Sequence, residues 1–531
     1  MNRQKKVIGI RAEQRPDLDV LTFEHLSLDG LATPDEVRSY ADLQTNANRI
    51  AAGLLAKGVE KGDRIAIMMR NHAEFPECMI ACSILGALFV PVDPRTKGDK
   101  LAYVLANSGS SGLVCADYCL EEVSKIREKS TKLKWILGLD SGEKAPAIAD
   151  SAGVEPLAEL LAQQADTVDV RVDSPLDPIS IMYTSGTTGD PKGIVGANFR
   201  FVAAGMLGDL FGYQPDERPY TGLSFTHGNA QSVTLMSSLS KGLRAVFSRR
   251  FTRSKLWDVC RHYGCTTYSL VGGMAMAIYS QPEGDNDADN PVRMVVSGGM
   301  PAAIWKSFEE RFDLRIFEFY GAMDGGGMAF KPIGEGPIGS FGRPMEGLEM
   351  KILDADDDEC APGVVGEICT RAAGGEAPPV EYHGNPEASK KKIKRGWNRS
   401  GDMGHRDEED WLFFDYRAGG GIRHNGDFIN PSFVEKAIAE SHEVADVYVY
   451  GVKSVSLTPG EKDVVATIVF AEGHEGQVAA VFAACREKLE SNFVPSYLQV
   501  VDEIPKTASE KPQERILLEQ FAPDAANVHT E

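Results

Sequence analysis

The chain has 531 residues, of which 43% are hydrophobic and 25% charged. This length and composition predict a globular protein of roughly two to four domains with a large buried core. Its net charge of −21 argues against nucleic acid or an anionic membrane surface as the main partner, because both favour a basic face.

Cysteine usage and hydropathy indicate a reducing compartment. The nine cysteines form no zinc-type CxxC pair, so we expect buried free thiols. Residues 1–10 lack the apolar core of a signal peptide. The longest apolar run, residues 79–92, contains Gly86 and Pro91 and is typical of a buried helix followed by a strand. We predict a cytoplasmic protein without a transmembrane segment; a homodimer is left open.

Strands alternate with helices in the first part of the chain. Ser39 and Asp42 have the spacing of a capping box at the start of a helix that Gly58 ends. The elements expected next are strand 64–69, helix 73–87, strand 88–92, helix 101–107 and strand 112–115. This alternation predicts right-handed βαβ crossovers and a parallel sheet.

Residues 183–193 read Tyr-Thr-Ser-Gly-Thr-Thr-Gly-Asp-Pro-Lys-Gly. Glycines let a backbone approach a ligand closely, hydroxyls are short donors, and Lys192 adds a positive charge. Backbone N–H groups in such a turn form a nest for anions. The stretch departs from the Walker pattern, which requires Gly at 191 and Ser or Thr after the lysine. It predicts a polyphosphate-binding loop, with a plain surface loop as the alternative.

The alternation resumes beyond this loop. The elements expected are helices 200–212, 231–240, 254–263, 275–281 and 302–311, and strands 244–248, 266–271, 292–297 and 314–319. Open α/β sheets bind ligands beyond the carboxyl ends of their strands. Residues 297–301 and 320–327 follow two of these strands, so we interpret them as walls of one nucleotide site.

Near residue 336 the sequence pattern changes from alternating helices and strands to short strands, such as 347–353 and 366–371, which is typical of a small β subdomain. The lysine-rich run 390–395 is expected to be solvated, with contact to an anionic ligand as the alternative. Three glycines at 419–421 predict a hinge. Beyond them we expect helix 431–440, strands 446–451 and 464–470, helix 477–492 and strand 498–501, which make a compact α+β domain.

Several segments together make the chain resemble the adenylate-forming ligases, a superfamily of acyl-CoA synthetases, peptide-synthetase adenylation domains and beetle luciferases. The matching segments are 183–193, 297–301, 320–324, 400–402, Arg417, Gly426, Ile429, Pro431, Glu435 and the loop carrying Lys511. The resemblance implies an α/β N-terminal domain of parallel sheets over residues 1–417, with the β subdomain at 336–417. A mobile α+β domain would cover residues 418–531.

The resemblance also implies a two-step reaction using ATP, Mg²⁺ and CoA. A carboxylate attacks the α-phosphate of ATP and releases pyrophosphate, and a thiol then displaces AMP from the acyl-adenylate. Joining two anions requires positive charge and firm alignment. The alternatives are an enzyme that loads a carrier protein and a catalytically silent ATP-binding regulator.

By the resemblance, residues of the phosphate loop would bind the nucleotide phosphates: Thr184, Ser185, Gly186, Thr187, Thr188 and Lys192. Adenine and ribose would be bound by Gly299, Tyr320, Gly321, Ala322, Asp402, Arg417 and Gly426. Lys511 would bridge the acyl carboxylate and the nucleotide. His227 would lie near the substrate carboxylate, and Asp324 with Thr184 would hold Mg²⁺.

Four positions depart from the family pattern. Met323 and Asp324 stand where Thr and Glu are usual, Gly420 occupies the hinge position, and Glu510 replaces the Gly before Lys511. We expect Asp324 to keep the metal, and Glu510 to keep Lys511 protonated. Lys506 is the fallback for Lys511.

The acyl pocket is expected between residues 227–231, 271–274 and 322–327. Its glycines, Gly272 and Gly273 included, would leave room for a bulky, branched or medium-chain acid. Asn229, Gln231 and Asp324 would suit a polar or cationic substituent, so a carnitine-type acid is an alternative.

Overall fold

A computed structural model describes residues 3–27, 34–143, 148, 151–183, 191–325, 327–418, 422–424, 427–429, 431–454, 462–489, 491–507 and 510–530. The chain divides into two units, residues 1–269 with 379–391 and residues 270–378 with 392–531. We call them the first and the second unit.

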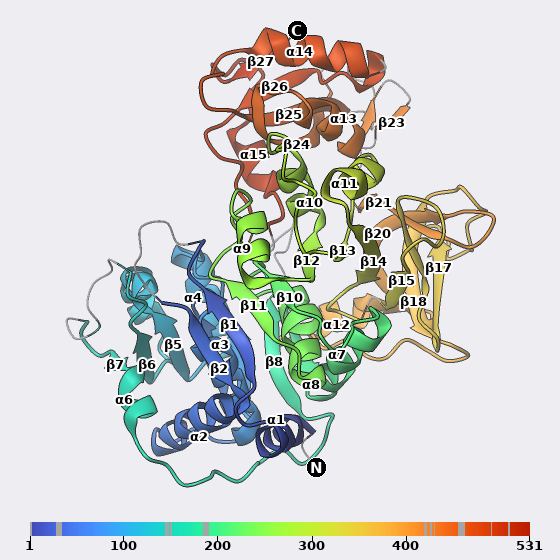
Figure 1. Ribbon diagram of the computed structural model, residues 1–531. Helices are drawn as coiled ribbons and strands as arrows, with labels where there is room; N and C mark the ends of the chain where they lie inside the picture. Colours follow the sequence, from blue (N-terminus) through green and yellow to red (C-terminus); the bar gives the residue numbers. More distant parts are fainter. Residues whose placement is uncertain are drawn as a thin grey trace. The chain divides into compact units, whose positions relative to one another are not determined.

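The first unit contains a seven-stranded sheet, in blue to teal in Figure 1. Its strand order is β7-β6-β5-β3-β4-β8-β9, and every neighbouring pair except β8–β9 is parallel. The strands are β3 (Arg64–Met68), β4 (Leu88–Pro91), β5 (Gly112–Ala116), β6 (Trp135–Leu139), β7 (Glu155–Pro156), β8 (Pro178–Tyr183) and β9 (Gly193–Ala197). The helices between them are α2 (Tyr40–Ala56), α3 (Glu74–Leu85), α4 (Gly98–Ser108), α5 (Leu120–Ile126) and α6 (Leu157–Ala162). The core joins α4 and α5 to the sheet through Leu105, Val123, Val90 and Leu113.

The predicted phosphate loop connects the two antiparallel strands of this sheet. Tyr183, the last residue of β8, pairs with Gly193, the first residue of β9. The loop between them, of which residues 184–190 lie outside the described residues, therefore closes a β-hairpin. A Walker loop leads from a strand into a helix, so this geometry is a different one.

A second group of strands completes the first unit, with the order β12-β10-β11-β1-β2. They are β1 (Asp19–Glu24), β2 (Glu36–Ser39), β10 (Pro219–Thr221), β11 (Ala245–Ser248) and β12 (Thr267–Val271). The accompanying helices are α1 (Arg3–Gln14), α7 (Phe199–Leu210), α8 (Ser237–Lys241) and α9 (Leu256–Tyr263). Neighbouring pairs are parallel except β1–β2.

The second unit begins with two parallel strands, β13 (Met294–Gly298) and β14 (Arg315–Gly321), and helices α10 (Gly272–Tyr279) and α11 (Trp305–Phe312). Antiparallel strands continue from β14 in the order β15-β16-β21-β20-β18-β17. They are β15 (Met328–Lys331), β16 (Ser340–Pro344), β17 (Leu348–Leu353), β18 (Gly366–Ala372), β20 (Trp397–Arg406) and β21 (Leu412–Arg417). The short β19 (Ile393–Lys394) precedes β20, and it follows helix α12 (Pro386–Lys392), of which residues 386–391 belong to the first unit.

The C-terminal part of the second unit has a four-stranded sheet, β24-β25-β26-β27, in orange and red in Figure 1. Its elements are α13 (Pro431–Ala439), β24 (Val444–Lys453), β25 (Lys462–Phe470), α14 (Val478–Lys488), β26 (Tyr497–Val500), α15 (Glu514–Gln520) and β27 (Val528–His529). The hairpin β22 (Ile422–His424) and β23 (Asp427–Ile429) precedes α13.

The predicted α/β fold with a smaller α+β C-terminal part is confirmed. The capping box at Ser39 and Asp42 is present, and all nine cysteines are free and buried. Among the described residues, no helix has both the length and the apolarity that a membrane crossing needs. The domain boundary at 417/418 stays a prediction.

The predicted helix 231–240 is confirmed, but its first part is not α-helical. Residues Ala230–Met236 form a π-helix, and α8 follows it. The hydroxyl of Ser237 donates to the carbonyl of Val233, which occupies an acceptor of the regular helical ladder. The hydrophobic residues of this segment recur with a helical period, and this pattern does not distinguish a π-helix from an α-helix. Single-turn π segments often lie at functional sites.

Candidate nucleotide site

Several predicted site residues lie outside the described residues. These are Thr184, Ser185, Gly186, Thr187 and Thr188 in the phosphate loop, Gly426, and the hinge glycines 419–421. Lys192 is described and exposed, with its ammonium 5.5 Å from the ring centroid of Tyr382. The second unit holds most of the remaining predicted residues, and these form the candidate nucleotide site.

Asp402 is the centre of this group. It is 3% exposed on β20, and its cross-strand partner on β21 is Arg417. The Nε of Arg417 lies 2.9 Å from Oδ1 of Asp402, and the hydroxyl of Tyr320 donates to Oδ2 at 2.7 Å. The hydroxyl of Ser400 accepts the backbone N–H of Asp402 at 2.9 Å. A buried carboxylate with two oriented neighbours still has lone pairs for further donors, as binding of a ribose diol requires.

Tyr320 lies near the end of β14 and is oriented from two sides. Its ring stacks on Phe341 with centroids 4.7 Å apart, and its hydroxyl is fixed by Asp402. Burial, followed by the charge of Asp402, holds the pKa of Tyr320 well above its usual value, so the phenol stays a donor. Gly321 ends β14 and pairs with Met328, and Ala322 begins the turn that follows. Phe341 thus occupies one face of the Tyr320 ring.

Gly299 depends on Glu318, a residue that the sequence did not single out. Gly299 has a φ of 103°, a conformation that favours glycine. Its backbone N–H donates to Glu318, and that of Met300 donates to the same carboxylate at 3.2 Å. Glu318 is 3% exposed, and burial raises its pKa to about 7 against the opposing effect of these two N–H groups. Glu318 therefore fixes the turn that we expect to contact adenine.

The loop carrying Lys511 is closed by its own hydrogen bonds. Thr507 N–H donates to the Lys511 carbonyl at 2.8 Å, and Glu510 N–H donates to the Thr507 carbonyl at 3.0 Å. The backbones of Lys506 and Pro512 form an isolated antiparallel β-bridge. Lys506 is paired with Asp446 at 2.6 Å, and both side chains are largely buried. The fallback lysine is therefore occupied within the C-terminal part of the chain.

Lys511 itself lies near Asp402 and Arg417. Its surface is accessible to solvent, yet protein surrounds it closely enough that burial, with Arg417, lowers its pKa, while Asp402 acts in the opposite direction. The effect of Glu510 on the protonation of Lys511 stays a prediction. A negatively charged substrate beside Lys511 would favour the ammonium form.

The sequence predicts that Gly272 and Gly273 leave room for an acyl group, and the structure contradicts this prediction. A Cβ at Gly272 would lie 2.5 Å from the carbonyl oxygen of Gly299, and one at Gly273 would lie 2.6 Å from that of Glu510. These glycines let two backbone segments approach the start of α10: the turn at 297–301 and the Lys511 loop. The space that the missing side chains vacate is filled by protein.

Asp324 is not a free carboxylate in this structure. Its Oδ2 lies 2.6 Å from Nζ of Lys392, and its backbone carbonyl accepts Nδ2 of Asn398 at 3.0 Å. Among the described residues, no group of three or more His, Cys, Asp and Glu could hold a metal ion. Because Lys392 already contacts Oδ2, Asp324 does not fit as a direct ligand of Mg²⁺, which needs an open carboxylate oxygen.

His227 lies in the first unit, one turn before the π-helix. Its Nδ1 accepts the backbone N–H of Asn229 at 3.2 Å, which assigns the proton of a neutral ring to Nε2. The amide of Gln231 donates to the Phe225 carbonyl at 2.6 Å, whereas the side-chain oxygens of Asn229 and Gln231 are buried without a hydrogen-bond partner. Two acceptors beside a histidine are thus available to a donor.

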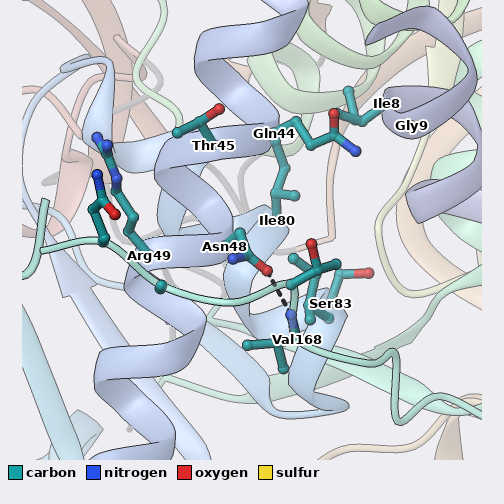
Figure 2. A pocket seen from close by; sticks show the side chains of 13 residues that line it. Ile8, Gly9, Gln44, Thr45, Asn48, Arg49, Ile80, Ser83 and Val168 are labelled. Atoms are coloured by element: carbon teal, nitrogen blue, oxygen red, sulfur yellow. Dashed lines mark hydrogen bonds between the residues drawn. The ribbon is translucent and has the colours of Figure 1, made fainter. Parts of the chain in front are cut away.

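A cavity of about 420 Å³ lies between α1, α2, α3 and residues 164–168 of the first unit, as Figure 2 shows. Asn48 forms part of its wall, because Oδ1 accepts the N–H of Val168 at 2.7 Å and Nδ2 donates to the Asp166 carbonyl at 2.8 Å. The predicted site residues that the structure describes do not line it, so we assign the cavity no part in nucleotide binding.

Comparison with known families gives two matches along the chain. The AMP-binding enzyme model matches residues 10–375, and the AMP-binding enzyme C-terminal domain model matches residues 434–511. Crotonobetaine/carnitine–CoA ligase of Salmonella heidelberg (strain SL476) is 29% identical over 480 residues, which cover 89% of this chain and 91% of that protein. The enzyme of Salmonella typhi shows the same identity and coverage.

Solved structures share the fold at lower identity. The anthranilate CoA ligase AuaEII in complex with anthranoyl-AMP superimposes with a TM-score of 0.83 at 20% identity, over 98% of this chain and 97% of that one. The o-succinylbenzoate CoA synthetase MenE from Bacillus subtilis, in complex with ATP and magnesium ion, gives a TM-score of 0.72 at 22% identity. It covers 96% of this chain and 99% of its own.

Proposed function

The chain belongs to the AMP-binding enzymes, and we propose that it is an acyl-CoA synthetase that converts a carboxylic acid to its CoA thioester in two steps. In the first, a carboxylate oxygen bonds to the α-phosphorus of ATP, and the bond to the β-phosphate oxygen breaks to release pyrophosphate. In the second, the CoA thiol attacks the acyl carbon, and AMP leaves with the electron pair of the acyl–oxygen bond. Mg²⁺ accompanies ATP and offsets the charge of its phosphates.

The observation that carries this proposal is the grouping of Asp402, Tyr320, Arg417 and Lys511 in the second unit. Asp402 would accept the ribose hydroxyls, and the ring of Tyr320 would stack on adenine. Lys511 would contact both the acyl carboxylate and the nucleotide, which aligns the attacking oxygen and offsets the repulsion of two anions. In this scheme Glu318 positions the turn that contacts adenine.

The experiment that tests this scheme compares pyrophosphate exchange into ATP for Lys511→Ala and Lys506→Ala. Lys511→Ala should lower exchange by about 100-fold or more, since it removes a contact to the developing charge. Lys506→Ala should stay within about threefold, because Lys506 serves the structure through Asp446. Equal losses, or a larger loss for Lys506→Ala, would contradict the assignment of Lys511.

For the acid, we propose a polar or zwitterionic substrate of the carnitine type. The curated relatives named above act on crotonobetaine and carnitine by name. The unpartnered buried oxygens of Asn229 and Gln231 support an acyl group that carries a donor or a cation, because an unmet buried acceptor is costly. Pyrophosphate release should be faster with carnitine-type acids than with fatty acids or benzoate of similar size, and the reverse order would refute this substrate class.

The thiol acceptor, the cellular compartment and the oligomeric state are also part of the proposed function. CoA is expected to be the thiol acceptor, and a panel with CoA and a phosphopantetheinyl carrier protein separates the two by thioester product. We place the reaction in the cytoplasm, since nine buried free thiols are typical of a reducing compartment. A homodimer is testable by light scattering of the purified chain.

A further inference from the structure

An ion pair occupies the position where the resemblance places a metal ligand. Nζ of Lys392 lies 2.6 Å from Oδ2 of Asp324, with the two side chains 9% and 18% exposed. Lys392 ends α12 and also lies 3.4 Å from the carbonyl oxygen of Ser400. Its ammonium is thus held between the turn after β14 and the strand that carries Asp402.

The surroundings of the pair fix both partners. Asn398 is fully buried on β20, and its side-chain amide donates to the backbone carbonyl of Asp324 at 3.0 Å. The hydroxyl of Thr370 on β18 donates to the carbonyl of Gly325 at 3.4 Å. Two strands of the antiparallel sheet, β18 and β20, therefore hold the turn that carries Asp324 in place beside Lys392.

The lysine-rich run around Lys392 is not uniformly solvated. Lys391 is exposed, whereas Lys394 and Arg395 approach Asp357 at 2.9 and 3.3 Å. Lys392 is the member of the run that turns toward Asp324. Because water is largely excluded from both partners, the attraction between them is screened less than that of a surface pair.

We propose that Lys392, and not a metal ion, neutralises Asp324, so that Lys392 is a positioning residue for the turn beside the nucleotide site. A magnesium ion bound directly by Asp324 would have to displace an ammonium that already contacts the carboxylate and repels a second cation. Mg²⁺ demands close oxygen ligands in octahedral geometry and gives up water reluctantly. A metal that accompanies ATP would then be bound without Asp324. This inference rests on the proposed function.

The test is Mn²⁺ binding, measured by electron paramagnetic resonance with saturating α,β-methylene ATP, which the enzyme does not cleave between those phosphates. Asp324→Asn should leave the Mn²⁺ affinity within about twofold of wild type. Lys392→Met should tighten it by about fivefold or more, since it frees the carboxylate as an oxygen ligand. Lys391→Met, which removes the same charge from an exposed neighbour, should leave it unchanged.

The double variant Asp324→Asn/Lys392→Met guards against misfolding, because it leaves neither charge buried alone. It should return to within about twofold of the wild-type Mn²⁺ affinity. A loss of about tenfold or more in Asp324→Asn or in the double variant would overturn the assignment, as would an unchanged affinity in Lys392→Met. Wild-type pyrophosphate exchange, measured in parallel, tests the proposed function separately.

Discussion

The titration of Glu318 can be tested directly, because its carboxylate is buried and accepts two backbone N–H groups of the turn at residues 297–301. Burial raises the pKa of Glu318 to about 7 in the folded chain, whereas an unperturbed glutamate has a pKa of about 4.3. The folded state therefore binds the proton more tightly. Its stabilising effect is complete below about pH 4.3 and is lost as the pH rises through 7.

The size of the effect follows from linkage, at about 1.4 kcal/mol for each pH unit between the two pKa values. Between pH 5.5 and 7.5, wild type should lose about 2 kcal/mol of unfolding free energy that Glu318→Gln, which cannot titrate, keeps. This corresponds to about 2 to 4 °C in Tm, depending on whether the chain unfolds as one unit or as two.

The assay is thermal unfolding of wild type, Glu318→Gln and the exposed control Glu310→Gln from pH 5.5 to 8.5. The Tm of Glu318→Gln relative to wild type should rise up to about pH 7 and then level off, whereas Glu310→Gln should show no such trend, because Glu310 is 67% exposed. A difference independent of pH would refute the reasoning. AMP binding should weaken by about 3- to 10-fold, since the amide replaces one of two acceptors.

Three further substitutions test other contacts. Glu510→Gly should stabilise the chain by about 0.5–1 kcal/mol in thermal unfolding, because Glu510 has a φ of 57° and glycine adopts this region without strain. Gly273→Ala should lower pyrophosphate exchange by about tenfold with AMP binding within about threefold, because its Cβ would meet the Glu510 carbonyl; unchanged exchange would count against this docking contact. Glu77→Ala should lower the free energy of unfolding by about 3–5 kcal/mol in denaturant titration, because it leaves Arg38 without its most buried partner, which lies 2.7 Å away. A decrease below about 1 kcal/mol would show that this ion pair contributes little to stability.

The sequence could identify residues that belong to a motif but not the contacts that position them. Asp402 and Arg417 were each predicted, and the register of β20 and β21 makes them neighbours. Glu318 was missed because it lies inside a strand, where a charged residue resembles an ordinary solvent-facing position. Lys392 was missed because a run of lysines is typical of a solvated helix end, and its burial depends on a turn far away in the chain. Long-range pairing of this kind leaves no local pattern.

The Lys511 loop has hydrogen bonds of its own and also contacts the start of α10. Its backbone hydrogen bonds run between Thr507, Glu510 and Lys511, and Lys506 ties it to Asp446 of the C-terminal sheet. Its approach to α10 occurs at Gly273, where the carbonyl of Glu510 occupies the place of a side chain. The hydrogen bonds that define the shape of the loop would therefore travel with it when it withdraws. In the proposed function, Lys511 is presented for adenylation and the site then admits a thiol, and a loop whose shape does not depend on its docking allows both.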